Sequence, residues 1–303
     1  IVQWTGTGSN GTIGHGLDSA PEWLVVKRTD GAGQDWVWKN DVALGAARGI
    51  YLNDSGCEVT DSTFWNGSSA NSTTFPVGTS DRTNGNGDSY IAWFTNSTTG
   101  SQYTGTGDSN GPLVNLGFAP SIIIIKSKDC SGAVNWLLYT KDTNEYLSID
   151  NTNSSGANSG NYLIEFLSNG FRLGGNGAGI NASGRSYNYY CWAEDPDEES
   201  PLLTNSFNIE TYVGNAGNPR SVSGFGFSPD LLWIKKRNSA DDNVFFDSVR
   251  GPQQELISNS TAAEATKSGD AIISFDTDGF TTGNNGAINA NSDDYVSWAW
   301  KAN

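Results

Sequence analysis

Short runs of four or five apolar residues alternate with stretches rich in Gly, Asn, Ser and Thr along the whole chain of 303 residues. Runs of this length between turn-forming residues are typical of β-strands rather than of helices. The longest run, Ile122–Ile125, is far shorter than the roughly 20 residues that a membrane-spanning helix needs. The pattern therefore predicts an all-β protein without membrane insertion.

One motif occurs three times: a proline, one variable residue, four mostly apolar residues and a lysine. Its copies are Pro21–Lys27, Pro120–Lys126 and Pro229–Lys235. The proline cannot lie inside a central strand, so it marks the strand's start. The apolar run predicts a strand buried on both faces, and the lysine predicts the point where that strand leaves the core.

Three further features accompany this motif in a constant order. They are an aromatic residue followed by a Gly-rich turn (Trp4, Tyr103, Tyr212), a Phe with Gly three residues later (Phe75, Phe171, Phe280), and an aromatic closing segment (Tyr90–Trp93, Tyr189–Trp192, Tyr295–Trp298). Self-similarity at a spacing of about 100 residues predicts three tandem β-sandwich repeats, each of a jelly-roll or lectin-like kind.

The repeats are expected at residues 1–98, 99–197 and 198–303, with one β-sandwich each. The second boundary falls on Glu194–Pro201, an acidic segment with two prolines that is typical of a solvated linker. Helix is expected only at Thr261–Thr266, capped by Ser260, and as a single turn near Val42–Ala47.

The net charge of −16 argues against nucleic acid as a partner, because such a chain repels phosphate backbones. The sequence begins at Ile1 and has no Met, so we expect a mature form or a part of a longer protein. Its three cysteines, Cys57, Cys130 and Cys191, fall at non-equivalent places in the repeats, which predicts no disulfide framework. Cys191 aligns with Ala92 and Ser297, which predicts a small, semi-buried position rather than a reactive thiol.

Four motifs could carry chemistry, and each has a structural interpretation that we favour. His15 is the only histidine, and its equivalents Leu116 and Phe225 are apolar, which predicts a packing site rather than a catalytic base. Gly6–Gly11 matches G-x-G-x-x-G, but the polar sequence that follows indicates a turn. The paired carboxylates that glycoside hydrolysis requires have candidates only in turns: Asp241 with Asp242, Asp276 with Asp278, and Asp293 with Asp294.

No metal or other cofactor is expected. A structural calcium ion in the acidic loops stays an open alternative, although the chain has no loop of the D-x-D-x-D-G type.

Trp65 and Asn66 are the ligand-binding candidates. They lie in the polar stretch Thr63–Ser69, which has no clear counterpart in the other repeats. An exposed aromatic ring beside Asn and Ser is a common way to meet a sugar, by stacking and hydrogen bonding. The favoured interpretation is nevertheless that Trp65 closes the end of the sandwich.

The third repeat resembles a repeat domain of uncharacterised function found in tail and fibre proteins of bacteriophages, notably cyanophages. The matching segments are Phe227–Lys235, Phe246–Gly251, Ser258–Thr266, Ser274–Gly283 and Tyr295–Ala302. The first repeat keeps only Arg48-Gly49 of the middle segments, and the second has Tyr139–Leu147 there instead. The shared motifs look structural, so no catalytic residue is carried over.

The resemblance implies a non-enzymatic protein of the virion surface, namely a segment of a tail fibre or appendage. Its partners would be other virion subunits and a host-surface glycan, and a homo-oligomer, with a trimer as the prior, is expected. The alternatives are a capsid decoration protein, which a broad apolar patch would favour, a secreted or cell-surface adhesin or filament component, and a glycan-degrading spike, which needs converging carboxylates.

Overall fold

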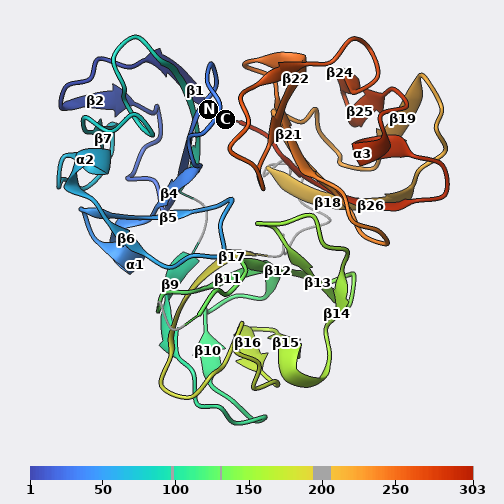
Figure 1. Cartoon of the computed structure of the whole chain (residues 1–303). Coiled ribbons are helices and arrows are strands. Elements are labelled where there is room, and N and C mark those ends of the chain that lie inside the picture. Colours follow the sequence, from blue (N-terminus) through green and yellow to red (C-terminus); the bar gives the residue numbers. More distant parts are fainter. Residues whose placement is uncertain (97–98, 130–131, 194–205, 303) are drawn as a thin grey trace. The chain divides into compact units, whose positions relative to one another are not determined.

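The computed structural model describes residues 1–96, 99–129, 132–193 and 206–302. It is nearly all β, with 44% strand and 5% helix, which confirms the predicted all-β class. The strands pair in antiparallel sheets, and three of these have six strands each (Figure 1). We call these three sheets I, II and III in chain order.

The three sheets share one strand order, in which the first strand of each sequence repeat pairs with the last. Sheet I runs β1 (Val2–Thr5), β8 (Ser89–Thr95), β3 (Trp23–Arg28), β4 (Val37–Lys39), β5 (Arg48–Tyr51), β6 (Val59–Thr60). Sheet II runs β9 (Thr99–Thr104), β17 (Ser186–Ala193), β11 (Pro120–Ser127), β12 (Leu137–Thr140), β13 (Glu145–Ser148), β14 (Gly156–Ala157). Sheet III runs β18 (Phe207–Val213), β26 (Asp294–Trp300), β20 (Leu231–Lys236), β21 (Asn243–Asp247), β22 (Gly251–Ile257), β23 (Ala265–Thr266).

A smaller sheet accompanies each large one. Its strands are β2 (Gly11–Gly14) and β7 (Thr74–Val77) beside sheet I, β10 (Leu113–Asn115), β16 (Gly170–Leu173) and β15 (Ile164–Leu167) beside sheet II, and β19 (Arg220–Ser223), β25 (Gly279–Thr282) and β24 (Ile272–Asp276) beside sheet III. The interval that holds β15 or β24 in the later repeats holds the helix α2 (Ser62–Trp65) in the first.

The remaining helices are α1 (Asp41–Leu44), the 3₁₀ turn η1 (Gly160–Tyr162) and α3 (Gly286–Asn289). α1 overlaps the single turn expected near Val42–Ala47, but the helix expected at Thr261–Thr266 is wrong. Ala265 pairs with Glu255 of the neighbouring strand, and Glu264 makes an ion pair with Arg250. Pairing with β22 therefore overrides the local helix propensity of this Ala-rich segment.

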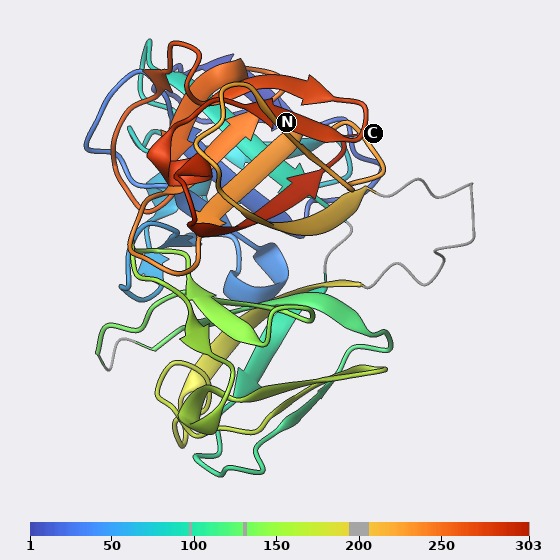
Figure 2. The same ribbon diagram turned by 90° about the vertical axis from the view of Figure 1, so that its right-hand side faces the viewer.

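The strand motif that begins with proline forms the centre of each large sheet, as expected from its apolar run. All four isoleucines of β11 are buried, and β11 pairs with β12 on one side and β17 on the other. Figure 2 shows the sheets from the side, with the strands of sheet II in green and yellow. β-Branched residues suit such a position because they pack well on a pleated surface.

The same aromatic triad lies between each large sheet and its small sheet. The opening aromatic residue stacks on a closing tyrosine, with ring centroids 5.4 Å apart for Trp4 and Tyr90, 5.1 Å for Tyr103 and Tyr187, and 5.2 Å for Tyr212 and Tyr295. A phenylalanine of the small sheet meets the opener edge-on at 5.8, 6.4 and 6.2 Å (Phe75, Phe171, Phe280). Offset-stacked and edge-to-face contacts are the favoured geometries of aromatic pairs.

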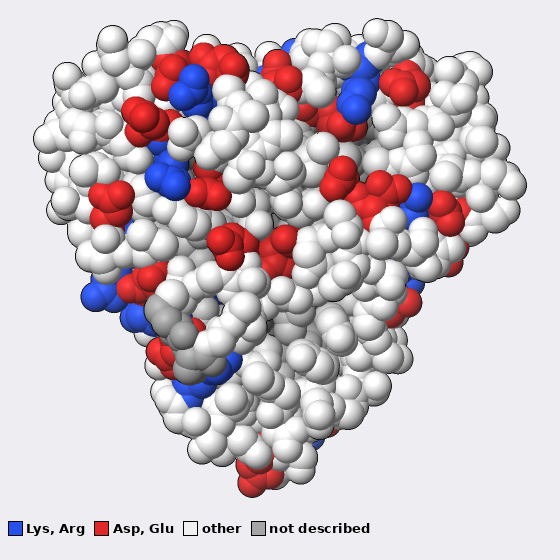
Figure 3. All heavy atoms as spheres, in the orientation of Figure 1, with Lys and Arg blue, Asp and Glu red and all other residues white. Residues whose placement is uncertain are grey.

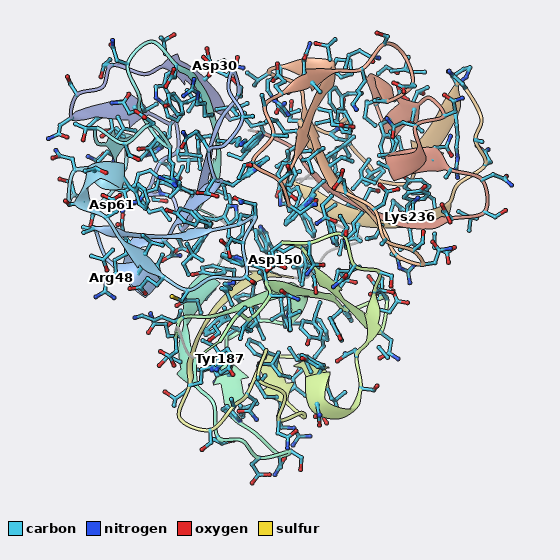
Figure 4. All side chains as sticks on the ribbon, in the orientation of Figure 1. Asp30, Arg48, Asp61, Asp150, Tyr187 and Lys236 are labelled. Atoms are coloured by element: carbon cyan, nitrogen blue, oxygen red, sulfur yellow. The ribbon has the colours of Figure 1, made fainter. Side chains whose placement is uncertain are left out.

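The triad corrects the alignment of the second repeat by two residues. Tyr187, and not Tyr189, is the counterpart of Tyr90. Its hydroxyl accepts a hydrogen bond from the Ala182 amide and donates one to the Ala178 carbonyl, and Tyr90 bonds Gly85 and Asp81 at the same spacing. Figure 4 marks Tyr187 inside the layer beneath sheet II.

Cys191 consequently aligns with Phe94 and Ala299, because the strand pairings place Ile123 opposite Cys191, Leu24 opposite Phe94 and Leu232 opposite Ala299. It is fully buried, whereas the sequence alignment predicted a semi-buried position. A shift of two residues keeps every side chain on the same face of a strand, so the apolar pattern alone cannot detect it.

A buried asparagine six residues before the closing tyrosine ties the turns of each repeat together. Asn84, Asn181 and Asn289 each accept a hydrogen bond from the backbone amide that follows the opening turn, at 3.1, 2.8 and 3.0 Å. Each also donates to two backbone carbonyls, one of which belongs to a glycine six residues earlier. This asparagine was not among the residues predicted from the sequence, although its constant spacing from the tyrosine is a usable signal.

The chain folds into two compact units. Unit 1 comprises Ile1–Asp150 and Gly156–Glu194, and unit 2 comprises Asn151–Ser155 and Asp195–Asn303. Sheets I and II belong to unit 1 and sheet III to unit 2. The predicted linker Glu194–Pro201 lies outside the described residues, and the division into three domains stays a prediction. In the described part of the chain, no helix has the length and apolarity of a transmembrane helix.

The asparagine provides the first prediction. Asn289→Ala should lower the free energy of unfolding by about 3 kcal/mol, because it leaves buried backbone groups without their hydrogen-bond partner. Urea denaturation measures this change. Asn284→Ala is the matched control, since Asn284 is exposed in the same loop and its replacement should change stability little. Equal, small effects of both substitutions would contradict the proposed tie.

Candidate functional site: a buried lysine and its docking loop

The repeated lysines do not leave the core, and that prediction is wrong. Lys27, Lys126 and Lys235 are each 0% exposed. In β11, Ile123 and Ile125 belong to the cluster beneath sheet II. Because side chains alternate along a strand, Lys126 lies on the opposite side, which we call the outer face. The outer faces are therefore buried as well as the inner ones.

Each buried ammonium has an acceptor within its own repeat. Lys27 donates to the Gln34 carbonyl and Lys126 to the Val134 carbonyl, both at 2.6 Å. Lys235 donates to the Asn243 side-chain oxygen at 2.6 Å. Burying a charged group is costly unless it is hydrogen-bonded, so these contacts are required rather than incidental.

An aromatic ring supports the first two lysines. The Nζ of Lys27 lies 5.9 Å from the ring centroid of Trp36, and that of Lys126 lies 5.6 Å from Trp136. A cation near the face of an indole ring is attracted by the ring quadrupole. In the third repeat, Asn243 stands opposite Lys235 in the strand pairing, where it supplies a hydrogen bond in place of a ring.

In unit 1, a loop of the first repeat supplies further acceptors to the second. This docking loop comprises residues 51–58. Lys126 donates to the Asp54 carbonyl at 3.1 Å, and the Val134 amide donates to the Ser55 carbonyl at 3.0 Å. The indole of Trp136 donates to the Tyr51 carbonyl at 2.9 Å. All three hydrogen bonds use the backbone of the loop.

The same geometry occurs in unit 2 with the segment Asn151–Ser155, which follows β13 as the docking loop follows β5. Lys235 and Asn243 donate to the Asn151 carbonyl at 3.3 and 3.1 Å. The Asp241 amide donates to the Thr152 carbonyl at 2.9 Å. Backbone recognition explains why two loops with different side chains are held in the same way.

A polar side chain shapes each such loop from within its own repeat. Asn53 accepts a hydrogen bond from the Trp36 amide at 2.8 Å, and Asp150 accepts one from the Trp136 amide at 3.1 Å. Asn259 does the same for the Asn243 amide at 2.7 Å. Neither the loops nor these residues were predicted from the sequence. The neighbouring residues of Asn53, Asp150 and Asn259 differ from repeat to repeat, so no motif marks the position.

Burial shifts the pKa values at this site. It lowers the pKa of Lys27 and of Lys126 to about 8 and raises that of Asp150 to about 6. The charge of Lys126 partly counteracts the shift of Asp150, which Figure 4 labels. Shifted pKa values can mark catalytic groups, but ion-pair networks produce them too. Here Lys126 is bound by two backbone carbonyls, one from each of two repeats. We call this contact, in which a buried lysine holds a loop of the preceding repeat, a joint.

Two side-chain links reinforce the docking loop. The side chain of Glu58 is only 8% exposed and forms ion pairs with Arg48 of its own repeat and, at 3.6 Å, with Lys128 of the second repeat. Cys57 is disulfide-bonded, although its non-equivalent place in the repeats predicted no disulfide framework. Cys191 is the free thiol among the described cysteines, and burial raises its pKa well above the usual value.

Trp65 does not offer the exposed ring that sugar stacking requires. Its side chain is 0% exposed, and its indole nitrogen donates to the Arg48 carbonyl at 3.0 Å. The ring belongs to the core cluster of sheet I, which fits the packing interpretation favoured above. Asn66 ends α2 in the left-handed conformation, with φ 52°, and is exposed.

His15 is engaged by two backbone groups. Its Nδ1 accepts a hydrogen bond from the Leu17 amide at 3.1 Å, so Nε2 carries the proton and donates to the Asn71 carbonyl at 2.9 Å. The ring also meets Phe94 edge-on. These contacts hold the β2 end against the loop before β7, in keeping with a packing role.

The other candidate motifs lie in turns. Gly6–Gly11 connects β1 to β2, and a strand rather than a helix follows it. Asp276–Gly279 is the tip between β24 and β25, where Gly279 has φ 139° and a Cβ would lie 2.1 Å from the Val222 carbonyl. The Asp276 carboxylate accepts hydrogen bonds from Ser274 and Thr281.

Structural partners also engage Asp241, Asp293 and Asp278. Asp241 and Asp293 both pair with Lys236, at 2.6 and 3.0 Å, and Figure 4 labels this lysine. Asp278 accepts from the amides of Gly224 and Gly226. Among the residues that the structure describes, no group of three or more His, Cys, Asp or Glu side chains could hold a metal ion.

A family model described as a domain of unknown function (DUF7483) matches residues 1–196 and 204–303. The chain belongs to the DUF7483 family. The match includes all three buried lysines and the docking loop, so these features lie within the DUF7483 region. Neither a curated protein nor a solved structure gave a significant match.

Because Trp65 is buried and Asn66 is exposed, substitutions at the two positions should differ in their effect on stability. Trp65→Ala should lower the free energy of unfolding by about 3–5 kcal/mol, because it leaves a cavity and an unpaired Arg48 carbonyl. Asn66→Gly should change it little, since glycine adopts φ near +50° without strain. Chemical denaturation monitored by circular dichroism compares the two. A Trp65→Ala protein as stable as the wild type would mean that the ring is not part of the core.

The buried lysine predicts a pH dependence. Between its native pKa of about 8 and the ordinary value of 10.5, the unfolded chain binds the proton that the native protein has released. Stability therefore rises with pH in this window. The unfolding free energy of the wild type minus that of Lys126→Met should increase from neutral pH to about pH 9.5, as measured by urea titrations. A difference independent of pH would show that Lys126 keeps its proton.

Proposed function

We propose that this protein is a non-enzymatic structural segment of a bacteriophage particle, in a tail fibre or comparable appendage, built of three tandem β-sandwich repeats. The observation that carries the proposal is the repeated joint: a loop from one repeat is held by the buried lysine of the next. Such joints suit tandem repeats of a structural protein, because each loop is held through backbone hydrogen bonds that do not depend on its side chains.

The three repeats themselves are supported by their shared construction. Each large sheet has the same strand order, and each encloses the same aromatic triad and the same asparagine tie. Tandem repeats with matching cores are typical of structural proteins whose stability adds up along the chain. The proposed location in a bacteriophage particle rests on the resemblance of the third repeat to domains of phage tail and fibre proteins.

The residues with catalytic potential support a non-enzymatic role. His15 is occupied by two backbone groups, and every candidate pair of carboxylates has at least one member bound to a lysine, hydroxyl or amide group of the fold. The buried lysines hold loops. A catalytic site needs at least some reactive groups directed at a shared space, and these side chains are directed at their own structural partners.

Two features support a location on the particle surface. The disulfide of Cys57 is typical of proteins that work in an oxidising environment. Acidic and basic side chains are dispersed among uncharged residues on the face shown in Figure 3. The exposed large hydrophobic residues in the described chain are single residues, Leu113, Val213 and Val249, so the observations favour an appendage over a capsid decoration protein.

Host glycan is the proposed external ligand, and the exposed polar loop after α2 is its proposed contact. Asn66, Gly67, Ser68 and Ser69 are all exposed, and this loop interrupts the pattern shared by the repeats. Since Trp65 is buried, hydrogen bonding by Asn66 and the serines would carry recognition. The proposed partners within the particle are other virion subunits, with a homotrimer as the proposed assembly.

Co-sedimentation with envelope polysaccharide from candidate host cells tests this function. Saturable binding without release of oligosaccharide is expected. Asn66→Gly, which suits φ 52°, should weaken it several-fold, while Asn284→Ala, at an exposed asparagine of the third repeat, should leave it unchanged. Release of oligosaccharide would overturn the non-enzymatic role. Absence of binding would overturn the glycan ligand, and absence of the chain from purified particles, by mass spectrometry, would overturn the virion assignment.

A further inference from the structure

Asn188 is a buried amide that the described part of the chain leaves without a hydrogen-bond partner. It lies in β17 with 0% of its surface exposed, and neither its oxygen nor its nitrogen is hydrogen-bonded to a described residue. Its neighbours Tyr187 and Tyr189 belong to the cluster beneath sheet II, so Asn188 faces the outer side. A buried amide without hydrogen-bond partners is strongly unfavourable, because its polar groups lose water and gain nothing in return.

Two more polar atoms on the same outer face share this condition. Tyr190 is two residues further along β17 and so points to the same side as Asn188. Its ring centroid lies 4.4 Å from that of Trp38. The hydroxyl of Tyr190 and the indole nitrogen of Trp38 are both buried without a partner in the described structure. An amide, a hydroxyl and an indole N–H therefore share one region of unit 1.

A charged donor borders this region. Lys126 stands opposite Asn188 in the pairing of β11 with β17. Its ammonium carries three protons, of which two are directed to the Val134 and Asp54 carbonyls. The region thus combines several donors with the amide and hydroxyl oxygens as acceptors, which suits a small neutral molecule that both donates and accepts.

The other two repeats have apolar residues at the position of Asn188. The residue opposite Lys27 is Ile91, and the residue opposite Lys235 is Val296. Both are fully buried. An apolar residue thus fits this position of the fold, and the amide of the second repeat is an addition that packing does not require.

We propose that Asn188, Tyr190 and Trp38 form an internal hydration site, in which ordered water molecules bridge the three side chains on the outer face of sheet II. Buried water is bound where two to four polar groups can reach it, and these side chains bring an amide, a hydroxyl and an indole N–H to one region. The amide distinguishes this face of sheet II from the corresponding faces of sheets I and III, which have Ile91 and Val296 at its position. This inference stands independently of the proposed function.

Magnetic relaxation dispersion of water, which counts long-lived internal water molecules, tests the site. Asn188→Val, which introduces the residue of the third repeat, should hold at least one water molecule fewer than the wild type. Ile91→Val, at the equivalent position of the first repeat, should leave the number unchanged. An equal number in the wild type and Asn188→Val would overturn the proposal.

A crystal structure of the wild type gives a second measurement that does not depend on the folding of a variant. We expect ordered solvent within hydrogen-bonding distance of both amide atoms of Asn188 and of the Tyr190 hydroxyl. Apolar side chains packed directly against the amide, with no solvent between them, would overturn the proposal.

Discussion

Burial of the lysine at the end of each central strand is the constraint on which the rest of the structure depends. A buried ammonium must be surrounded by acceptors, and in unit 1 those acceptors come from two different repeats, as the Val134 and Asp54 carbonyls do for Lys126. A residue that would ordinarily end a strand in solvent thus connects one repeat to the next. The joint relies on backbone carbonyls, so it tolerates changes of loop sequence.

Inside each repeat, a different set of interactions holds the large sheet, the small sheet and the turns together. The stacked aromatic pair and the edge-on phenylalanine join the large sheet to the small one, and the asparagine tie closes the turns at their ends. These contacts use side chains with fixed geometries, and they recur at the same spacings. The parts of the repeats that differ, such as α2 with Trp65, lie outside these recurring contacts.

Some features of the candidate site could be predicted from the sequence, and others could not. The turn at Gly6–Gly11 and the packing role of His15 follow from local sequence and from comparison of the repeats. The docking loop does not, because its acceptors are carbonyls, which every residue has. The alignment error at Tyr189 has a related cause, since a slip of two residues preserves the alternation of apolar and polar positions.

The sequence by itself determined the all-β class, the central strands and the order of the recurring motifs, because strand length and alternation are local properties of a pleated chain. Tertiary structure alone decided that the lysines are buried, that Trp65 faces the core and that Thr261–Thr266 forms no helix. In each case the deciding partner lies elsewhere in the chain: the Asp54 carbonyl for Lys126, the Arg48 carbonyl for Trp65, and β22 for Ala265. The local pattern of apolar and polar residues limits the structures that a segment can adopt. Contacts with residues distant in sequence determine which of these structures forms.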